Sequence, residues 1–504
     1  MSQTLADVVT GHARTRPEGA AIIGPDGTTL TWRRLLHRAA QVANALVAAG
    51  VGHGDRVGHL DKNDPTFFEV ALGCNLVGAV VVGMNWRLSP RELEQIAGNV
   101  DLSLLVAGEE FLEQVPAELR ASERLVVSGA AYEAWIGHQS IEPPPAHVSP
   151  DDVVYQLYSS GTTGLPKGAL ITSANLSWTM RAASVIYGMD ETSVNLLVSP
   201  LFHIGGAGYG LTAIGLGATT VVARDLAPAN LLGLVAAHRV SHSFLVPSLV
   251  QMLIDAPGVT GTDLSSLRVI AYGGAPMSEP LLRRAMATLG CEFVGVYGST
   301  ETSGTVIFLA ARDHVPALMR SIGKPLDWVE VRVVDPATGA DSVGEAVGEL
   351  WVRSPVVIGG YWRQPEATSA ALVEGGWLRT GDAVYRNADG FFFLHDRIKD
   401  MVISGGENVY PAEVENVLSD HPGIAQVAVI GVPDVRWGET VKAVVVPREG
   451  VLLDEREVIA FCRERLAHYK CPTSVQVVGG LPRNASGKVL KKALRTQYAV
   501  DVAR

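Results

Sequence analysis

The chain has 504 residues, of which 47% are hydrophobic and 18% are charged, and its formal net charge is −11. This length supplies a large core and suggests about three domain-sized units. Because the net charge is acidic and no long basic run is present, the composition argues against a nucleic-acid partner.

The N-terminal half predicts neither export nor stable membrane insertion. The first residues lack a basic segment followed by an apolar one, so no secretory signal is recognised. The apolar stretch from Leu72 to Trp86 contains Asn75 and Asn85 and is shorter than the roughly 20 residues that a spanning helix needs. We therefore expect a cytoplasmic protein with reduced thiols. The cysteines, which show neither CxxC spacing nor the density of a disulfide framework, are Cys74, Cys291, Cys462 and Cys471.

Helical and strand-like segments alternate from the start of the chain to about residue 395, which is typical of layered α/β domains. Ser89-Pro90-Arg91-Glu92 is a capping box with Pro at the first helical position, so we expect a helix from Pro90 to about Gly98. The stretch from Ile141 to Pro150 is expected to be a connecting loop. Thr219 to Ala223 and Arg268 to Ala271 have the composition of buried strands.

The composition changes toward the C-terminus. Val, Trp and Tyr between Gly turns predict a β-rich subdomain from about Gly344 to Trp362, and a compact α+β segment of roughly 105 residues follows Arg397. We place the domain boundary at Lys399. The expected fold class is α/β, with a large N-terminal domain (residues 1–398) of layered α/β subdomains plus a β-rich subdomain, and a small mobile α+β C-terminal domain (residues 399–504).

The segment from Tyr158 to Gly168 has the composition of a phosphate-binding loop. Its Ser, Thr and Gly residues offer backbone N–H groups and hydroxyls to polyphosphate oxygens, and Lys167 adds a positive charge. In a Walker loop the Lys follows a Gly and precedes a Ser or Thr, whereas here Lys167 lies between Pro166 and Gly168. The segment predicts chemistry on ATP. Its candidate binding residues are Ser159, Ser160, Gly161, Thr162, Thr163, Gly164 and Lys167.

Further motifs follow along the chain. They are Tyr297-Gly298-Ser299-Thr300-Glu301, Thr380-Gly381-Asp382, Asp396 to Asp400 running into Ser404 to Asn408, and Pro482 to Lys488. Together with the phosphate-binding segment, their order and spacing resemble the adenylate-forming superfamily. Within that superfamily the chain is most similar to the acyl-CoA synthetases, also called fatty-acid-CoA ligases, and the similarity covers nearly all of its length.

This resemblance implies two half-reactions. An acid attacks the α-phosphorus of ATP with release of pyrophosphate, and a thiol then opens the resulting acyl-AMP. Thr162, Thr163 and Lys167 would hold the β- and γ-phosphates, Thr300 would contact the α-phosphate, and Glu301 resembles the family's magnesium ligand. A solvated surface carboxylate is the alternative for Glu301. The implied cofactors are ATP, Mg²⁺ and coenzyme A.

Other motif residues are suited to the nucleoside. Tyr297 offers a ring face to adenine, and Gly273-Gly274-Ala275-Pro276 offers an open backbone edge to a base or an acyl group, with a plain turn as the alternative. Asp382 is suited to accept hydrogen bonds from both ribose hydroxyls, and Arg397 can donate to the same sugar or its phosphate. The candidate nucleotide-binding residues here are Gly274, Ala275, Tyr297, Gly298, Thr300, Asp382 and Arg397.

The C-terminal segment resembles the mobile domain of the family. Lys488 matches the adenylation lysine, which reaches the α-phosphate and the acid in the first step and leaves in the second. Lys399 matches the hinge, and Gly405 and Gly406 would line a pantetheine tunnel. Trp437 resembles a further CoA contact, with a buried core Trp as the alternative. Lys491, Lys492 and Arg495 follow at helical spacing and add a basic face.

We expect the acyl pocket to be built by Phe202 to Gly208, by Phe244 to Met252 and by Gly295, which are mostly apolar or small. His203 resembles the residue at the gate of the pocket, and a structural His is the alternative. Because His203 stands where amino-acid-activating domains carry an Asp, and no Arg is present to pair with a second carboxylate, a hydrophobic monocarboxylic acid is favoured. A long alkyl chain, an aryl ring and a polycyclic system remain open. The candidate pocket residues are His203, Gly205, Gly273 and Gly295.

The sequence therefore predicts an ATP-dependent acyl-CoA synthetase, with Lys488, Thr163, Glu301 and Lys167 as its catalytic residues and Glu301 on the metal. One alternative is an enzyme that loads a carrier protein instead of free CoA. Another is a catalytically silent nucleotide-binding or acyl-sensing protein, which the presence of Lys488 and Glu301 disfavours. A homodimer is an open alternative to a monomer.

Overall fold

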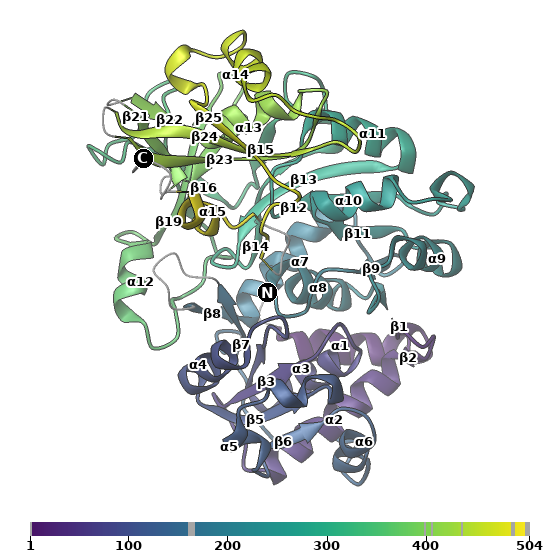
Figure 1. The fold of residues 1–504 in the computed structure, drawn as a ribbon. Helices are drawn as coiled ribbons and strands as arrows, with labels where there is room; N and C mark the ends of the chain where they lie inside the picture. The colour runs from purple at the N-terminus through teal and green to yellow at the C-terminus, as the bar shows by residue number, and fades with distance from the viewer. Residues whose placement is uncertain are drawn as a thin grey trace.

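The structure is a computed structural model that describes residues 3–159, 167–397, 400–404, 407–434, 437–484 and 489–498. Within these residues the strands form three sheets, each with helices packed on it. In Figure 1 the six-stranded sheet lies at the bottom, a larger sheet crosses the middle and the C-terminal sheet lies at the top.

The lower sheet has the strand order β6-β5-β3-β4-β7-β8 and is parallel except for the β7–β8 pair. Its strands are β3 (Arg56–Leu60), β4 (Val80–Gly83), β5 (Leu102–Ala107), β6 (Leu125–Val127), β7 (Val153–Ser159) and β8 (Lys167–Thr172). The helices between them are α2 (Trp32–Ala48), α3 (Thr66–Val77), α4 (Pro90–Val100), η1 (Glu109–Gln114), α5 (Ala117–Arg120) and α6 (Ala130–Gly137). Helix α2 packs along α3, and Trp32, Phe67, Phe68 and Tyr155 are completely buried in the resulting core.

The middle sheet has the strand order β16-β17-β19-β20-β15-β14-β13-β12-β11-β9-β10-β1-β2, with β18 beside β19. The strands from β13 to β1 are parallel, and those from β14 to β16 pair antiparallel. The parallel part and its edge contain β1 (Ala20–Ile23), β2 (Thr29–Thr31), β9 (Val194–Leu197), β10 (Thr219–Val222), β11 (His242–Leu245), β12 (Val269–Gly273) and β13 (Glu292–Ser299). The antiparallel part contains β14 (Gly304–Leu309), β15 (Ser321–Pro325), β16 (Glu330–Val334), β17 (Gly348–Arg353), β18 (Leu372–Val373), β19 (Trp377–Arg386) and β20 (Phe392–Arg397).

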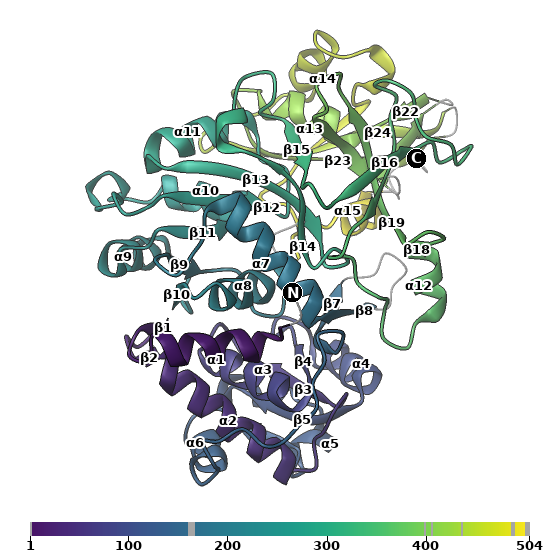
Figure 2. The same cartoon turned by 180° about the vertical axis from the view of Figure 1, so that it is seen from behind.

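Helices cover this sheet and join it to the lower one. They are α1 (Leu5–Thr15), α7 (Ser173–Tyr187), η2 (Ile204–Gly208), α8 (Tyr209–Gly215), α9 (Pro228–His238), α10 (Pro247–Ile254), η3 (Val259–Gly261), α11 (Glu279–Leu289), η4 (Ala311–Asp313) and α12 (Pro365–Ala371). Seen from behind, α1 runs along the junction between the lower and middle sheets, where it contacts α2, α3, α7 and α8 (Figure 2).

The C-terminal sheet has the order β22-β21-β24-β23, with β25 parallel to β24. Its elements are β21 (Val402–Ser404), β22 (Glu407–Val409), α13 (Pro411–Ser419), β23 (Ile424–Asp434), β24 (Gly438–Pro447), α14 (Glu455–Arg463), η6 (His468–Lys470), β25 (Ser474–Val477) and α15 (Lys491–Tyr498). Val429, Ala443, Val458 and Cys462 form part of its separate buried core. The boundary at Lys399 stays a prediction, because that residue lies outside the described residues.

The expected α/β fold class is confirmed, and several predicted elements are found. Helix α4 begins at Pro90 with the Ser89–Glu92 capping box, and β10 and β12 lie where buried strands were expected. No helix among the described residues is long and apolar enough to cross a membrane. The basic face of α15 is more than solvated charge, because Lys491 pairs with Glu415 at 2.8 Å and Arg495 pairs with Asp400 at 2.9 Å.

Candidate active site

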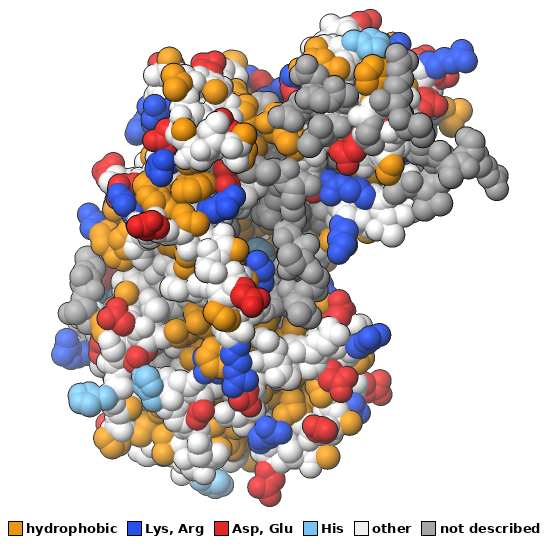
Figure 3. Space-filling model, turned by 90° about the vertical axis from the view of Figure 1, so that its left-hand side faces the viewer, with side chains coloured by type: hydrophobic (Ala, Val, Ile, Leu, Met, Phe, Trp, Pro, Cys, Tyr) orange, Lys and Arg blue, Asp and Glu red, His pale blue; other side chains and the backbone are white. Residues whose placement is uncertain are grey.

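A cavity of about 1280 Å³ is lined by residues from the lower sheet, the middle sheet and the C-terminal domain. On the face that carries α12, the molecular surface is hollowed between its upper part and the body below (Figure 3). Lys167, Thr300, Glu301 and Asp382 line the cavity on one side, and α7, η2 and α8 line it on another. Arg483, Asn484 and Leu490, which flank residues 485–488, line the same cavity.

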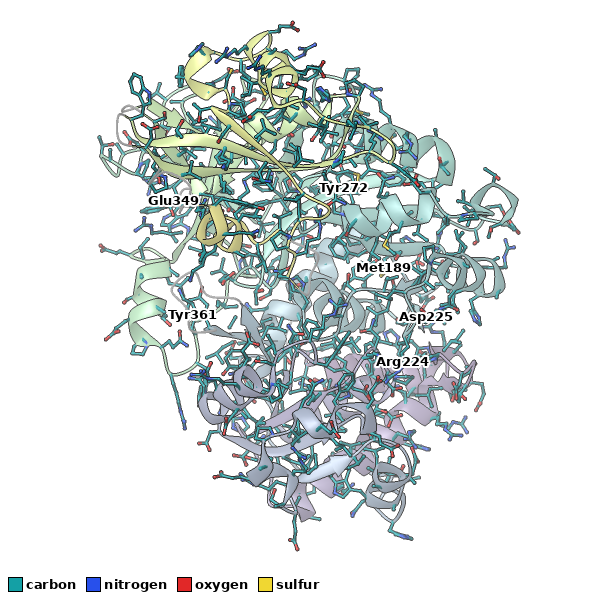
Figure 4. The ribbon with its side chains drawn as sticks, viewed as in Figure 1. Met189, Arg224, Asp225, Tyr272, Glu349 and Tyr361 are labelled. Carbon is teal, nitrogen blue, oxygen red and sulfur yellow. The ribbon has the colours of Figure 1, made fainter. Side chains whose placement is uncertain are left out.

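Tyr361 connects two of the predicted site residues. Its hydroxyl donates a 2.9 Å hydrogen bond to Glu301 Oε1, and the Lys167 ammonium lies 5.1 Å from the centroid of its ring. The chain before Tyr361 is held in place because Ile358 N–H donates to the carbonyl of Glu301 at 2.9 Å. Burial raises the pKa of Tyr361, and the neighbouring Glu301 carboxylate adds to this, so the phenol keeps its proton. Figure 4 labels Tyr361 beside α12.

Thr380-Gly381-Asp382 lies within β19 and not in a turn, at an irregularity in the pairing of β19 with β17, and two neighbours fix its geometry. Tyr297 Oη donates to Asp382 Oδ2 at 2.6 Å, which sets the orientation of a carboxylate that is itself buried. Gly381 has a φ of +71°, a conformation that favours glycine, and its N–H donates to Glu349 Oε1 at 3.2 Å. This part of β19 therefore presents Asp382 to the cavity in a defined geometry.

Glu349, labelled in Figure 4, is 3% exposed and lies on β17, which pairs with β19. Its Oε2 atom accepts hydrogen bonds from Trp351 Nε1 at 2.9 Å and from Arg379 Nε at 3.0 Å. A buried carboxylate is costly unless it is paired and hydrogen-bonded, and here both oxygens have donors. Through these hydrogen bonds, Glu349 links β17 to the part of β19 that carries Gly381 and Asp382.

The connection between β13 and β14 shapes the segment that carries Thr300 and Glu301. Thr302 Oγ1 accepts from the N–H of Ser299 at 2.8 Å and donates to the carbonyl of Gly304 at 2.7 Å. A Cβ atom on Gly298 would overlap the carbonyl oxygen of Gly304, so this position requires glycine. The tight connection holds Thr300 and Glu301 at the wall of the cavity.

The apolar side of the cavity is formed by η2 and its neighbours. His203 caps η2, because its Nδ1 atom accepts from the N–H of Gly205 at 3.2 Å, and it also lines the cavity. A Cβ atom on Gly205 would lie 2.7 Å from the ring of Phe244, so glycine permits this approach. The capping bond gives His203 a structural role alongside its place at the cavity.

Only some of the glycines expected in the pocket line the cavity. Gly274 lines the cavity with a φ of +76°, whereas Ala275, Gly273 and Gly295 are not among the lining residues. Gly273 is needed where β12 approaches β13, since a Cβ atom there would overlap the carbonyl of Val296. A Cβ atom on Gly295 would lie 2.9 Å from Tyr272 Oη.

Trp437 is 47% exposed, and its backbone N–H donates to Asp434 Oδ1 at 2.8 Å. The alternative of a buried core Trp is therefore wrong. Arg397 is the backbone partner of Asp382 in the β19–β20 pair, and Ser159 is the partner of Lys167 in the β7–β8 pair. The remaining predicted site residues lie outside the described residues: Ser160, Gly161, Thr162, Thr163, Gly164, Lys399, Gly405, Gly406 and Lys488.

The donor set at this site fits a cation held by few protein ligands. In the described part of the chain, no cluster of three His, Cys, Asp or Glu side chains could hold a metal ion. Mg²⁺ in nucleotide sites is commonly bound by one or two carboxylates together with phosphate oxygens and water. Glu301 supplies one carboxylate at the cavity wall, with Tyr361 bound to Oε1 and its second oxygen, Oε2, available for a metal.

Sequence reasoning missed Tyr361 and Glu349. Tyr361 lies in Gly359-Gly360-Tyr361-Trp362 and Glu349 in Gly348-Glu349-Leu350, both within the region that was predicted only as β-rich. An acidic residue inside an otherwise apolar strand was the available signal for Glu349, because such a residue is buried only with partners.

The chain matches known proteins in both sequence and structure. The family model "AMP-binding enzyme" matches residues 9–362, and the model "AMP-binding enzyme C-terminal domain" matches residues 413–488. A feruloyl-CoA synthase from an Amycolatopsis species is 41% identical over 97% of this chain and 97% of its own length. A fatty acid–acyl-carrier-protein ligase from Streptomyces coeruleorubidus is 38% identical over 100% of this chain and 98% of its own. The crystal structure of an anthranilate CoA ligase with anthranoyl-AMP has a TM-score of 0.93 and 28% identity, covering 100% of this chain and 98% of that one.

Proposed function

The chain belongs to the AMP-binding enzyme family of the adenylate-forming superfamily and is an AMP-forming acid–thiol ligase, and from this premise we propose that it converts a hydrophobic monocarboxylic acid into its CoA thioester. The acid would first become an acyl-AMP, with release of pyrophosphate. CoA would then take the acyl group and release AMP.

One observation carries this proposal. A single cavity joins charged groups suited to a nucleotide with a chamber of apolar and small residues suited to an uncharged acyl group. Lys167, Glu301 and Asp382 lie on the first side, and Phe202 and Gly208 lie on the second. The described lining residues from α7, η2 and α8 include no Lys or Arg, so this part of the cavity offers no cation to a second carboxylate.

In the adenylation step, an oxygen of the acid forms a bond to the α-phosphorus as the bond from that phosphorus to the pyrophosphate oxygen breaks. Positioning and charge stabilisation dominate such transfers. Lys167 and the Thr162–Thr163 pair would bind the β- and γ-phosphates, Thr300 the α-phosphate, and Asp382 the ribose. Mg²⁺ held by Glu301 would neutralise charge on the polyphosphate.

The thioester step would use the same cavity with the C-terminal domain in a second position. Arg483, Asn484 and Leu490 line the cavity in the present arrangement, which supports its assignment to the adenylation step, with Lys488 acting between them. We propose the boundary between residues 398 and 399, with Lys399 as the hinge. Gly405, Gly406 and the exposed Trp437 would then contact the pantetheine arm or CoA.

A second candidate acceptor is a carrier protein. The fatty acid–acyl-carrier-protein ligase that aligns with the whole chain favours it, whereas the feruloyl-CoA synthase favours free CoA. Both acceptors present a pantetheine thiol, so the acyl-AMP chemistry is common to the two. We propose free CoA, with action in the cytoplasm where ATP and CoA are available.

The decisive experiment offers the protein a pooled panel of alkyl, aryl and polycyclic acids with Mg-ATP, with and without CoA, and identifies products by mass spectrometry. A CoA thioester with an equal amount of AMP supports the proposal and gives the acid by its mass. Acyl-AMP or AMP without any thioester would favour a carrier protein as the acceptor. No ATP consumption with any acid would contradict the proposed function.

A further inference from the structure

The apolar side of the cavity contains hydroxyl groups for which the adenylation chemistry has no use. They come from α7, from α8 and from the start of β14. The residues are Thr179, Tyr187, Thr212, Ser303 and Thr305, and all of them line the cavity. A pocket for a plain hydrocarbon chain gains nothing from so many hydroxyls, because each needs a hydrogen-bond partner once water is displaced.

Tyr187 and Thr305 form a weak hydroxyl pair. Tyr187 lies two turns after Thr179 and one turn after Ala183, so these three residues share one face of α7. Tyr187 Oη lies 3.4 Å from Thr305 Oγ1, which is longer than a usual O–H···O hydrogen bond. Burial raises the pKa of Tyr187 to about 12, so its hydroxyl keeps its hydrogen at neutral pH. Both groups therefore retain capacity for a third partner.

Two further hydroxyls lack partners altogether. Thr212 is 2% exposed and Ser303 is 0% exposed, and neither side-chain oxygen has a hydrogen-bond partner among the described residues. Thr179 Oγ1 donates to the carbonyl of Ser303 at 3.2 Å, which joins α7 to this segment. Rotation about the Cβ–Oγ bond redirects the hydroxyl hydrogen of Thr212 or Ser303, and it breaks no hydrogen bond to the described residues. Both oxygens are buried in the wall of the cavity, so a polar ligand atom would remove the cost of leaving them unpaired only where the oxygen turns toward the cavity.

The walls around these hydroxyls are aromatic. The ring centroids of Tyr187 and Tyr209 are 6.0 Å apart in an edge-on arrangement, and those of Tyr209 and Phe244 are 5.9 Å apart. All three rings line the cavity. These three side chains give the cavity aromatic faces and edges, on which the ring of an aromatic acid can pack.

We propose that the acid is an aromatic monocarboxylate with a hydroxyl group on its ring. Its carboxylate would face Thr300 and Glu301, its ring would pack on the aromatic walls, and its hydroxyl would reach the Tyr187–Thr305 pair. A ring hydroxyl both donates and accepts, so it can satisfy one hydroxyl of the pair as donor and another as acceptor. This inference rests on the proposed function, because it names the substrate of the same site.

The first test compares acids in matched pairs on the unsubstituted protein. Cinnamate and benzoate are each compared with their 2-, 3- and 4-hydroxy derivatives, and decanoate represents a saturated chain; kcat/KM for thioester formation is measured. We expect one hydroxylated aromatic acid to exceed both its parent and decanoate by about tenfold or more, because a site built to bind a substrate hydroxyl rejects the analogue without it.

The second test assigns the selectivity to the hydroxyls. Thr305→Val and Thr212→Val remove a hydroxyl at nearly constant shape, and Thr305→Ser and Thr212→Ser keep it. In at least one valine variant, we expect the preference for the hydroxylated acid over its parent to fall about tenfold, while the matching serine variant keeps that preference. Equal loss of the preference in the serine and valine variants would overturn the assignment.

The outcomes distinguish a failure of this inference from a failure of the proposed function. Thioester formation from decanoate or from an unhydroxylated parent acid as efficiently as from any hydroxylated acid would overturn this inference and leave the proposed function standing. Absence of AMP formation with every acid would overturn the proposed function and the inference with it.

Discussion

Tyr361 donates a 2.9 Å hydrogen bond to Glu301, the residue proposed to hold magnesium, although the two residues are 60 positions apart in the chain. The ring of the same tyrosine lies beside the Lys167 ammonium. The contact joins the segment after β17 to both the β13–β14 connection and the start of β8. It positions a carboxylate whose direction would matter for a cation bound to the triphosphate.

Tyr361→Phe tests this positioning, because it removes the hydroxyl and keeps the ring beside Lys167. A hydrogen bond to a charged group contributes about 1.5–3 kcal/mol, so we expect kcat/KM for MgATP to fall about tenfold in pyrophosphate-release assays. The effect should shrink at high Mg²⁺ concentration if Glu301 is the cation ligand. Tyr469→Phe, at an exposed residue outside the cavity lining, is the control. Equal kcat/KM in both variants would show that the contact has no part in nucleotide binding.

Glu349→Gln should loosen the irregular part of β19 that presents Asp382. The amide keeps one acceptor but loses the charge that pairs with Arg379, so we expect KM for ATP to rise about tenfold with a smaller change in kcat. Glu330→Gln is a matched control, because Glu330 pairs with Arg353 in the same sheet but on the exposed surface, where ion pairs contribute little. A purely structural role would lower the melting temperature of Glu349→Gln and leave KM for ATP unchanged.

Lys488→Ala should separate the two half-reactions. Loss of a charge that stabilises the adenylation transition state is expected to slow acyl-AMP formation by about 100-fold or more. Thioester formation from supplied acyl-AMP and CoA should continue at nearly the unsubstituted rate. Lys492→Ala, at an exposed position of α15, is expected to change neither step. Comparable losses in both half-reactions would sink the assignment of Lys488.

Lys399→Pro tests the hinge. Proline fixes φ near −65°, so we expect the thioester step, which needs the second domain position, to slow much more than adenylation. Lys399→Ala removes the side chain while leaving φ variable, and it should affect the two steps equally and weakly. Single-turnover measurements of each step decide the question. A proline variant with matched effects on both steps would contradict the hinge.

His242 predicts a dependence of stability on pH. Burial lowers its pKa below the ordinary 6.5, with Arg268 adding to the effect and Asp190 opposing it. Its Nε2 atom lies 3.0 Å from the carbonyl of Tyr187, at the wall of the cavity. The fold thus favours neutral imidazole, so this contribution to stability is complete above about pH 6.5 and is lost as the pH falls toward the lower folded-state pKa.

The melting temperature measured between pH 5 and 8 should therefore fall on the acid side, and His242→Gln should flatten that dependence even if it lowers stability at all pH values. His147→Gln, at an exposed loop position, is the control and should retain the slope. Parallel curves for the unsubstituted protein and His242→Gln would assign the acid instability to other groups.

Local sequence was sufficient for the features that neighbouring residues decide. The Ser89–Glu92 capping box predicted the start of α4, because its hydrogen bonds are made within one helical turn. The order of short motifs predicted the family and, with it, the α/β fold class. Strands such as β10 were predicted because apolar, β-branched residues suit buried parallel positions.

The composition of the cavity depended on residues that no local pattern joins. Tyr361 is bridged to Ala169 of β8 in the lower sheet and reaches Glu301, which follows β13 of the middle sheet. Glu349 reaches Gly381 because β17 pairs with β19. Trp437 could not be assigned from sequence to core or surface, and the fold exposes it. Hydroxyls on α7, α8 and β14 likewise come together only because these elements pack against one another.

By itself, the sequence determined that this chain carries adenylate-forming chemistry, because motifs that bind a constant ligand keep a recognisable order and composition. Tertiary structure decided what surrounds the predicted site residues: which tyrosine binds Glu301, which carboxylate accepts from Gly381 beside Asp382, and which hydroxyls line the cavity. The physical reason is that hydrogen bonds and burial act between atoms close in space, and helix packing and strand order decide which residues those are.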